Sequence, residues 1–330
     1  MPEPRPISHR PVAGTRRSAS RLGFRVAAGP LGDPAGDARR RVLLRKARAR
    51  GVTTFDLPYE PGPPRSERLL AEAFPEPDPE LLVVVGRSLD GLARETERRA
   101  GQEPAADLAQ QLRRSLSESA ARLAPQTIGL LRWTASSSSR PAFDAVPGAL
   151  RPLVEEGLID GWVLEWDTEL GRDAITAEPE GLACGALSLL EPGPLSRVRS
   201  DASSERFGFF DTDPLASGRL DGRRFDTSLA DRGPTTPPPS ISELEREFRP
   251  VLELGFLGRG THRTLAQSAL QFAWHWPWVV SALVPLPGPE RLDEFLAAEG
   301  TSPLSEEEID RVLRHQHAGL PRRPAPDRLK

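Results

Sequence analysis

The amino-acid sequence predicts a single α/β domain of the (β/α)8 TIM barrel class, in which eight parallel strands form a closed ring surrounded by helices. Three observations lead to this prediction. Short β-type runs alternate with helical patterns, the strand candidates number eight, and a length of 330 residues suits one such barrel. Functional sites of this fold lie at the carboxyl ends of the strands.

The expected strands are short apolar runs bounded by turn residues. They cover residues 22–27, 53–56, 81–85, 127–131, 161–165, 182–187, 207–210 and 279–284. The helical patterns between and after them cover residues 37–50, 66–74, 105–123, 145–156, 261–274 and 304–315. Gly51 and Gly157 each follow a predicted helix, where glycine commonly ends one.

The chain divides into three predicted parts. Residues 1–20 are rich in Arg, Pro and Ser and are expected to be a flexible lead-in, because they contain no apolar stretch of a secretory signal. Residues 21–316 form the barrel, with an irregular loop at 219–240 that contains several prolines. Residues 317–330 form a C-terminal tail.

Composition excludes several classes of function. The 44 basic and 47 acidic residues are interspersed and give a net charge of −3, which offers no basic patch for nucleic acid. No apolar run is long enough to cross a membrane, so a cytoplasmic protein is expected. A single cysteine, Cys184, excludes an internal disulfide, and the five histidines form no metal-binding motif, so no metal is expected.

The stretch GVTTFDLPYEPGPPRSERLLAEAF, residues 51–74, contains the first candidate for chemistry. Asp56 ends a β-branched run and is followed by a loop rich in proline and glycine. In a barrel this places a carboxylate at the mouth. A purely structural role is the competing interpretation, in which Asp56 pairs with Arg87 at the end of the next strand.

Several motifs, in the right order from about residue 21 to 313, resemble the aldo-keto reductase superfamily of NADP-dependent barrel enzymes. They are SRLGFR, residues 20–25; the stretch around Asp56; SLSESAARLAPQTIGLLRWT; LVEEGLIDGWVLEW; DPLASGRLDG, residues 213–222; and AQSALQFAWHWPWVVSALVPLP. The resemblance implies the barrel fold and a site at its mouth.

The family's chemistry uses a tyrosine that protonates a carbonyl, a lysine beside it, an aspartate and a histidine. The resemblance places the aspartate at Asp56, but the tyrosine position is Pro61, and Tyr59, the chain's one tyrosine, comes two residues early. The lysine position is Arg87 and the histidine position is Thr134. Three of the four catalytic side chains are therefore replaced.

The cofactor positions implied by the resemblance are altered as well. Glu165 and Trp166 stand where the family has the Ser and Asn that bind nicotinamide. Pro214 and Leu215 match a further cofactor-binding element. Arg291 is the first basic residue after the late stretch that binds phosphate. The expectation is that the chain binds no NADP(H), or binds it weakly.

Three functional hypotheses follow. The first is an aldo-keto-reductase-like barrel, a pseudoenzyme, that has lost hydride transfer and either binds a small molecule or a protein partner or serves as a scaffold. The second is an NADP(H)-dependent oxidoreductase for aldehydes or ketones that uses Asp56, Tyr59 and Arg87 in an altered geometry. The third is other acid–base chemistry around Asp56, Glu165 and Arg87.

Overall fold

The structure is a computed structural model. It describes residues 6–27, 33–60, 64–88, 104–134, 140–165, 171, 181–191, 193, 206–222, 240–258 and 261–319. No helix in these ranges combines the length and the apolar character needed to cross a membrane.

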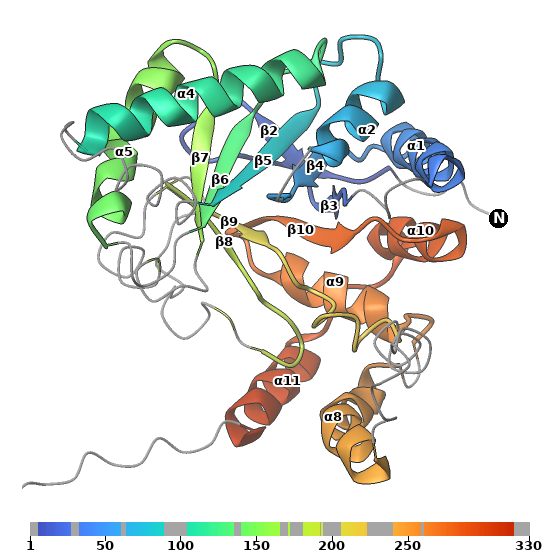
Figure 1. The fold of residues 1–330 in the computed structure, drawn as a ribbon. Helices are drawn as coiled ribbons and strands as arrows, with labels where there is room; N and C mark the ends of the chain where they lie inside the picture. Colours follow the sequence, from blue (N-terminus) through green and yellow to red (C-terminus); the bar gives the residue numbers. More distant parts are fainter. Residues whose placement is uncertain are drawn as a thin grey trace, which may run out of the picture.

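A closed ring of eight parallel strands forms the centre of the molecule (Figure 1). The strands are β3 (Leu22–Arg25), β4 (Thr54–Leu57), β5 (Leu82–Ser88), β6 (Leu130–Thr134), β7 (Gly161–Glu165), β8 (Gly181–Gly185), β9 (Phe207–Asp211) and β10 (Val279–Pro285). Each strand pairs with its neighbour in sequence, and β10 closes the ring on β3 through Ala282 opposite Leu22 and Pro285 opposite Arg25. The predicted (β/α)8 barrel is confirmed.

Eight helices accompany the ring in the described part of the chain, and some begin at capping residues. They are α1 (Pro34–Ala49), α2 (Arg65–Ala73), α4 (Pro104–Leu123), α5 (Arg140–Glu155), α8 (Ile241–Glu253), α9 (Leu265–His275), α10 (Pro289–Ala297) and α11 (Glu306–Gly319), with short 3₁₀ segments at Leu254–Gly258 and Ala298–Gly300. Ser240 and Thr264 form capping boxes at the starts of α8 and α9. Every predicted helix is present within a few residues, whereas α8 and α10 were not predicted.

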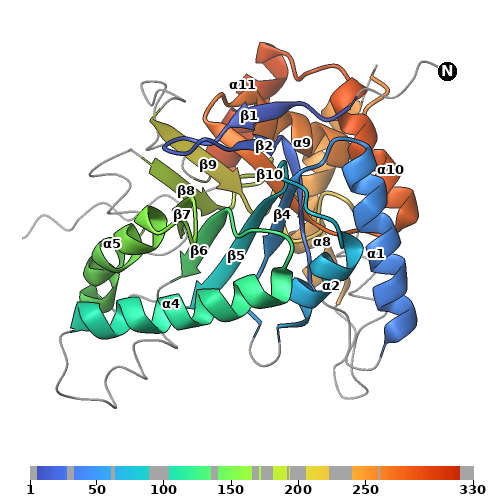
Figure 2. The ribbon, with the colours of Figure 1, turned by 90° about the horizontal axis from the view of Figure 1, so that it is seen from above.

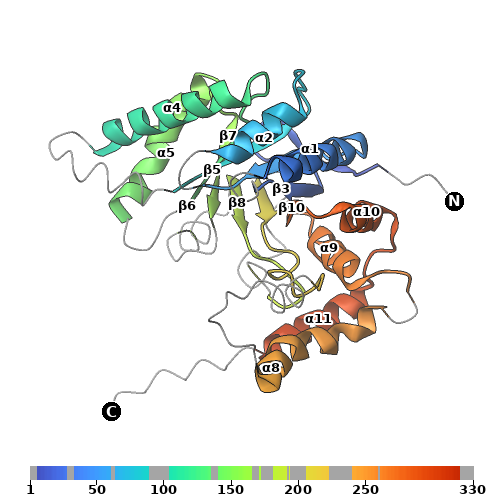
Figure 3. The same cartoon turned by 45° about the vertical axis from the view of Figure 1, so that its right-hand side comes forward.

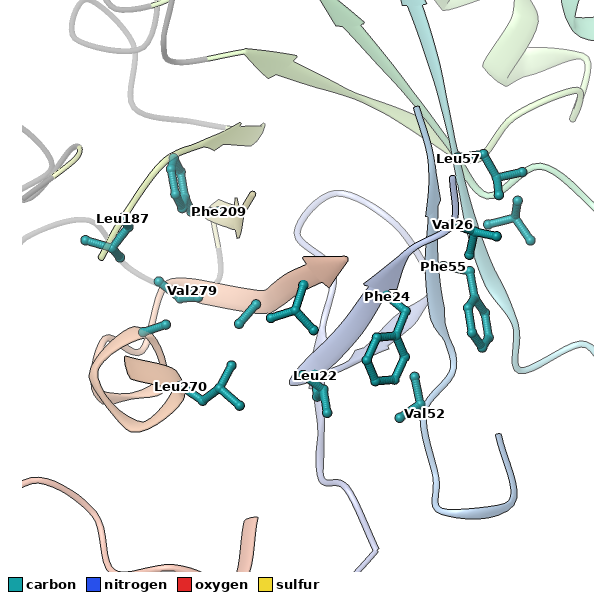
Figure 4. Packing of buried hydrophobic residues seen from close by; sticks show 14 of the residues in the cluster. Leu22, Phe24, Val26, Val52, Phe55, Leu57, Leu187, Phe209, Leu270 and Val279 are labelled. Carbon is teal, nitrogen blue, oxygen red and sulfur yellow. The ribbon is translucent and has the colours of Figure 1, made fainter. Parts of the chain in front are cut away.

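The apolar core has two layers, separated by the wall of the barrel. The outer layer lies between strands and helices and includes Phe24, Phe55 and Phe209 (Figure 4). The inner layer fills the barrel with residues such as Leu82, Leu130 and Phe210. Full burial of one such side chain contributes about 1.5–3 kcal/mol, so both layers stabilise the ring.

The N-terminal segment contains a β-hairpin, made of β1 (His9–Pro11) and β2 (Ser18–Ser20), which pair antiparallel. Val12 and Ala19 of this hairpin belong to the inner core layer. The expectation of a flexible lead-in is therefore wrong for the part of it that the structure describes, residues 6–20. A two-stranded hairpin is marginal alone, and its stability here comes from packing against the barrel.

Arg10 attaches the hairpin to the last part of the barrel. Its guanidinium donates hydrogen bonds to the carbonyl oxygens of Trp274 (2.9 Å), Trp276 (2.6 Å) and Pro277 (3.1 Å), at the end of α9. Burial and then the nearby charge of Arg21 lower the pKa of Arg10 to about 10. The side chain stays charged at neutral pH and adds hydrogen bonds to carbonyl groups at the carboxyl end of α9, where a cation is favoured. Figure 2 shows the hairpin beside β10.

Helices α8 and α11 lie side by side, away from the ring (Figure 3). The imidazole of His315 is 2.7 Å from a carboxylate oxygen of Glu253, and the guanidinium of Arg311 lies 3.9 Å from the centre of the Phe256 ring. Of the loop predicted at 219–240, residues 219–222 and 240 are described and the rest lies outside the described residues. The same holds for the end of the predicted tail, residues 320–330.

Candidate functional site at the barrel mouth

Alternation along the strands determines which side chains face the barrel interior. On β6, Leu130 belongs to the inner core layer, while Leu131 and Trp133 belong to the outer layer. Arg132 therefore faces inward. The same alternation turns Asp56 of β4 and Arg25 of β3 inward. These three side chains meet near the carboxyl ends of their strands, where sites of this fold lie.

Asp56 is completely buried and holds both arginines. Arg25 donates through Nε to Oδ2 of Asp56 at 3.0 Å. Arg132 donates through Nε to Oδ1 at 3.1 Å and through Nη2 to Oδ2 at 3.4 Å, a two-point contact. We call these three residues the Asp56 triad. A fully buried carboxylate is tolerated because charged donors satisfy it.

The electrostatics of Arg132 show how strongly the site favours its charge. Its side chain is only 9% exposed, and burial by itself lowers the pKa of Arg132. Attraction to Asp56, then to Cys184 and Glu165, outweighs this effect, so the net result is a raised pKa. Arg132 is therefore a permanent cation inside the barrel.

Arg87 does not contact Asp56, and the predicted Asp56–Arg87 pair is wrong. Arg87 follows the outward positions Val83 and Val85 along β5, and its guanidinium reaches α4. There Nε donates to Oγ of Ser115 at 2.7 Å, and Nη2 donates to Oγ of Ser119. A displacement of one residue along a strand moves a side chain to the other face, which is the physical reason for the error.

A buried acid holds the Arg87 group in place outside the barrel. Glu67 of α2 is 2% exposed and lies 3.6 Å from Nη2 of Arg87. It also accepts from Oγ of Ser119 at 2.7 Å and from Nε of Arg122 at 2.6 Å. Burial lowers the pKa of Arg87, and Glu67 partly offsets that effect. The group joins α2, β5 and α4, which is a structural task.

Tyr59 lies on the loop after β4 with half of its surface exposed. Its backbone crosses the inward face of β5 at Gly86. A Cβ on Gly86 would be 2.7 Å from the amide nitrogen of Tyr59 and 3.2 Å from Nη2 of Arg132. Glycine is thus needed for the loop to pass next to the Asp56 triad.

Several predicted site residues lie partly or wholly outside the described residues. Pro61 and Trp166 are outside them, and so is the side chain of Thr134, although its backbone ends β6 opposite Ser88. The described side chain of β6 at the site is Arg132, which sequence reasoning missed. The signal was available, since Arg132 is a charged residue between leucine and tryptophan in a buried strand.

Three of the predicted cofactor positions, Pro214, Leu215 and Arg291, lie beyond β9. Pro214 and Leu215 are buried in the segment after β9. Arg291, in the first turn of α10, donates to the carbonyl oxygen of Asp221 in the same segment. Glu165 ends β7 and adds to the negative potential at Arg132. Within the described residues no group of three or more His, Cys, Asp or Glu side chains could hold a metal ion.

The closed parallel ring with a charged site at its carboxyl end defines a (β/α)8 barrel protein. Comparison with solved structures shows which kind of (β/α)8 barrel this is. The chain is similar over 94% of its length to the aldo-keto reductase AKR11C1 from Bacillus halodurans, with TM-scores of 0.66 and 0.67 for the apo and holo forms and 14% identity, covering 96% of that chain. It is similar to the thermostable aldo-keto reductase Tm1743, solved with the inhibitor epalrestat, with a TM-score of 0.68 and 19% identity, covering 94% of this chain and all of that one.

The chain therefore has the aldo-keto reductase fold, as its motifs predicted. No protein-family model and no curated protein sequence matches it. At such low identity the similarity extends to the fold alone.

Proposed function

We propose that the chain is a small-molecule-binding barrel that does not transfer hydride. The observation that carries this proposal is the Asp56 triad. In the family's chemistry the equivalent aspartate pairs with a lysine that assists a phenol, whereas Asp56 is saturated by Arg25 and Arg132. A guanidinium remains protonated and cannot act as a proton-transfer group near neutral pH.

The remaining residues support the same proposal. Lys46 lies on the outer surface, where it pairs with Asp293 at 2.7 Å, and Lys330 is the last residue of the sequence. Arg87, at the predicted lysine position, is engaged with Ser115 outside the barrel. Thus no described lysine reaches the mouth, and the expectation of no or weak NADP(H) binding remains a prediction.

The test is cofactor binding and turnover by the purified full-length chain. NADPH is titrated while tryptophan fluorescence is followed, and NADPH consumption is then measured with a panel of aldehydes and ketones. The proposal expects no saturable binding below the millimolar range and no consumption above the buffer rate. Micromolar binding together with substrate-dependent NADPH consumption would refute it.

One observation favours the alternative of an NADP(H)-dependent oxidoreductase. The backbone of Tyr59 passes over Gly86, the residue that precedes Arg87, so the loop that carries the phenol runs along the end of β5. If the enzyme consumes NADPH, Tyr59→Phe should abolish that activity, and an active Tyr59→Phe variant would exclude this alternative.

A further inference from the structure

We propose that the mouth of the barrel binds a small monocarboxylate between the guanidinium groups of Arg25 and Arg132. The inference rests on the proposed function, because it names the ligand class of the same site. Three observations lead to it: donors without partners, a buried cation, and an imbalance of charge within the Asp56 triad.

The first observation concerns hydrogen-bond donors. A guanidinium carries five N–H groups. Arg25 uses only Nε, and Arg132 uses Nε and Nη2, all directed at Asp56. Among the described residues, nothing accepts from Nη1 or Nη2 of Arg25 or from Nη1 of Arg132. Two parallel N–H groups are the arrangement that a carboxylate binds in a bidentate manner.

The second observation concerns burial. The Arg132 side chain is 9% exposed and the Asp56 side chain is fully buried, so the contact between them lies in a largely desolvated place. No nitrogen of Arg132 is among the enclosed atoms that lack a partner, so its unused donor faces the open side of the site. A charge in such a place is screened little by water, which strengthens its attraction for an anion. The Arg25 side chain is 29% exposed, so the same site reaches solvent and a ligand can approach from there.

The third observation concerns charge. Two guanidinium groups face one carboxylate in the Asp56 triad, which leaves one positive charge in excess. Glu165 acts on Arg132 from the β7 side and limits how much further negative charge the mouth accepts. A monoanion balances the triad, whereas a dianion such as a phosphate monoester exceeds it. On the wall between Arg25 and Arg132, the inward positions are Asp56, Val84 and Gly86, and neither Val84 nor Gly86 has a polar side chain to compete for the arginines.

The experiment is calorimetric titration of the full-length chain with benzoate, pyruvate and acetate at constant ionic strength, with chloride as the blank. A free acid and a peptide C-terminus present the same carboxylate, so a tripeptide with a free C-terminus is compared with its amide. Arg25→Met is the test variant, because Asp56 keeps Arg132 as a partner and the fold should persist. Arg41→Met, which removes an outer-surface partner of Glu72, is the matched control.

We expect saturable carboxylate binding that weakens about 10- to 100-fold in Arg25→Met, as loss of charge-assisted hydrogen bonds implies, and is unchanged in Arg41→Met. Binding of the free tripeptide but not of its amide would support the site and identify a peptide source. Equal binding of acid and amide, an unaffected Arg25→Met variant, or no binding of any carboxylate would overturn the inference.

NADPH consumption, measured on the same samples, separates this inference from the proposed function. If the protein consumes no NADPH and binds no carboxylate, the inference about the ligand class is refuted but the proposed function is not. If the protein consumes NADPH, the proposed function is refuted, whether or not a carboxylate binds.

Discussion

Asp56→Asn should be one of the most destabilising single-atom changes in this barrel. The substitution keeps the shape of the side chain but removes its charge and places an NH2 group against an arginine donor. Arg132, with 9% of its side chain exposed, then becomes a buried cation without its direct ion-pair partner. Removing one member of a buried ion pair costs about 3–5 kcal/mol. Arg25 is more exposed, so we expect the lower part of that range, about 3 kcal/mol.

The expected change in melting temperature follows from the size of the chain. With an unfolding entropy of about 2.1 cal/mol/K per residue, a loss of about 3 kcal/mol in 330 residues lowers Tm by about 4 °C. Tryptophan fluorescence in urea and differential scanning calorimetry both measure the loss. Asp293→Asn is the matched control, because Asp293 pairs with Lys46 at the surface, with side chains 57% and 42% exposed, and should lose less than about 1 kcal/mol.

The comparison of the two variants decides the matter. If Asp56→Asn loses no more stability than Asp293→Asn, the buried charge of Arg132 is not compensated by Asp56 and the reasoning about the triad fails. A double variant, Asp56→Asn with Arg132→Met, should recover part of the loss, because it removes the uncompensated charge together with its former partner.

Further predictions concern the loop, the outer polar group and the hairpin. Gly86→Ala should lower the free energy of unfolding, measured in urea, by about 1–3 kcal/mol, because the added Cβ would be 2.7 Å from the Tyr59 backbone. Gly148→Ala is the control, because nothing lies within 4 Å of its added Cβ, and it should be neutral or stabilising by up to about 1 kcal/mol. A cost of Gly86→Ala no larger than that of Gly148→Ala would contradict the close packing. Arg87→Met should lower the free energy of unfolding by about 2 kcal/mol and leave carboxylate binding unchanged, and altered binding would place Arg87 at the mouth after all. Arg10→Met should speed amide hydrogen exchange in residues 9–20 while the rest of the barrel keeps its protection, and uniform exchange changes would show that the hairpin does not open separately.

The fold could be predicted from the sequence because its signals are local and repeated. Each strand is a short apolar run, and each predicted helix carries its own periodicity or a following glycine such as Gly51 or Gly157. The hairpin at residues 9–20 could not be predicted in this way. Its strands are three residues long, and they are stable because Arg10 and Val12 meet parts of the chain far away in sequence.

The position of Asp56 at the end of a barrel strand could be predicted from the sequence, but its partners could not. Asp56 lies at the barrel mouth as expected, because the end of a strand is visible in sequence. Its partners depend on which face of a neighbouring strand each residue occupies, and an error of one residue reverses that face. The role expected of Arg87 therefore belongs to Arg132, for which no role was predicted: Arg87 points outward to Ser115, and Arg132 points inward to Asp56.

The attachment of the hairpin has a consequence for folding kinetics. Arg10 binds carbonyl groups more than 260 residues further along the chain, and β3 pairs with β10 at a similar separation. Contacts between such distant segments require closure of a very long loop, and proteins dominated by them fold slowly. During synthesis the hairpin and β3 must therefore wait, with Val12 and Ala19 uncovered, until α9 and β10 have been made. Closure of the ring and docking of the hairpin are then late steps of folding. Before these steps, apolar side chains of the hairpin are uncovered, and the chain is most exposed to aggregation.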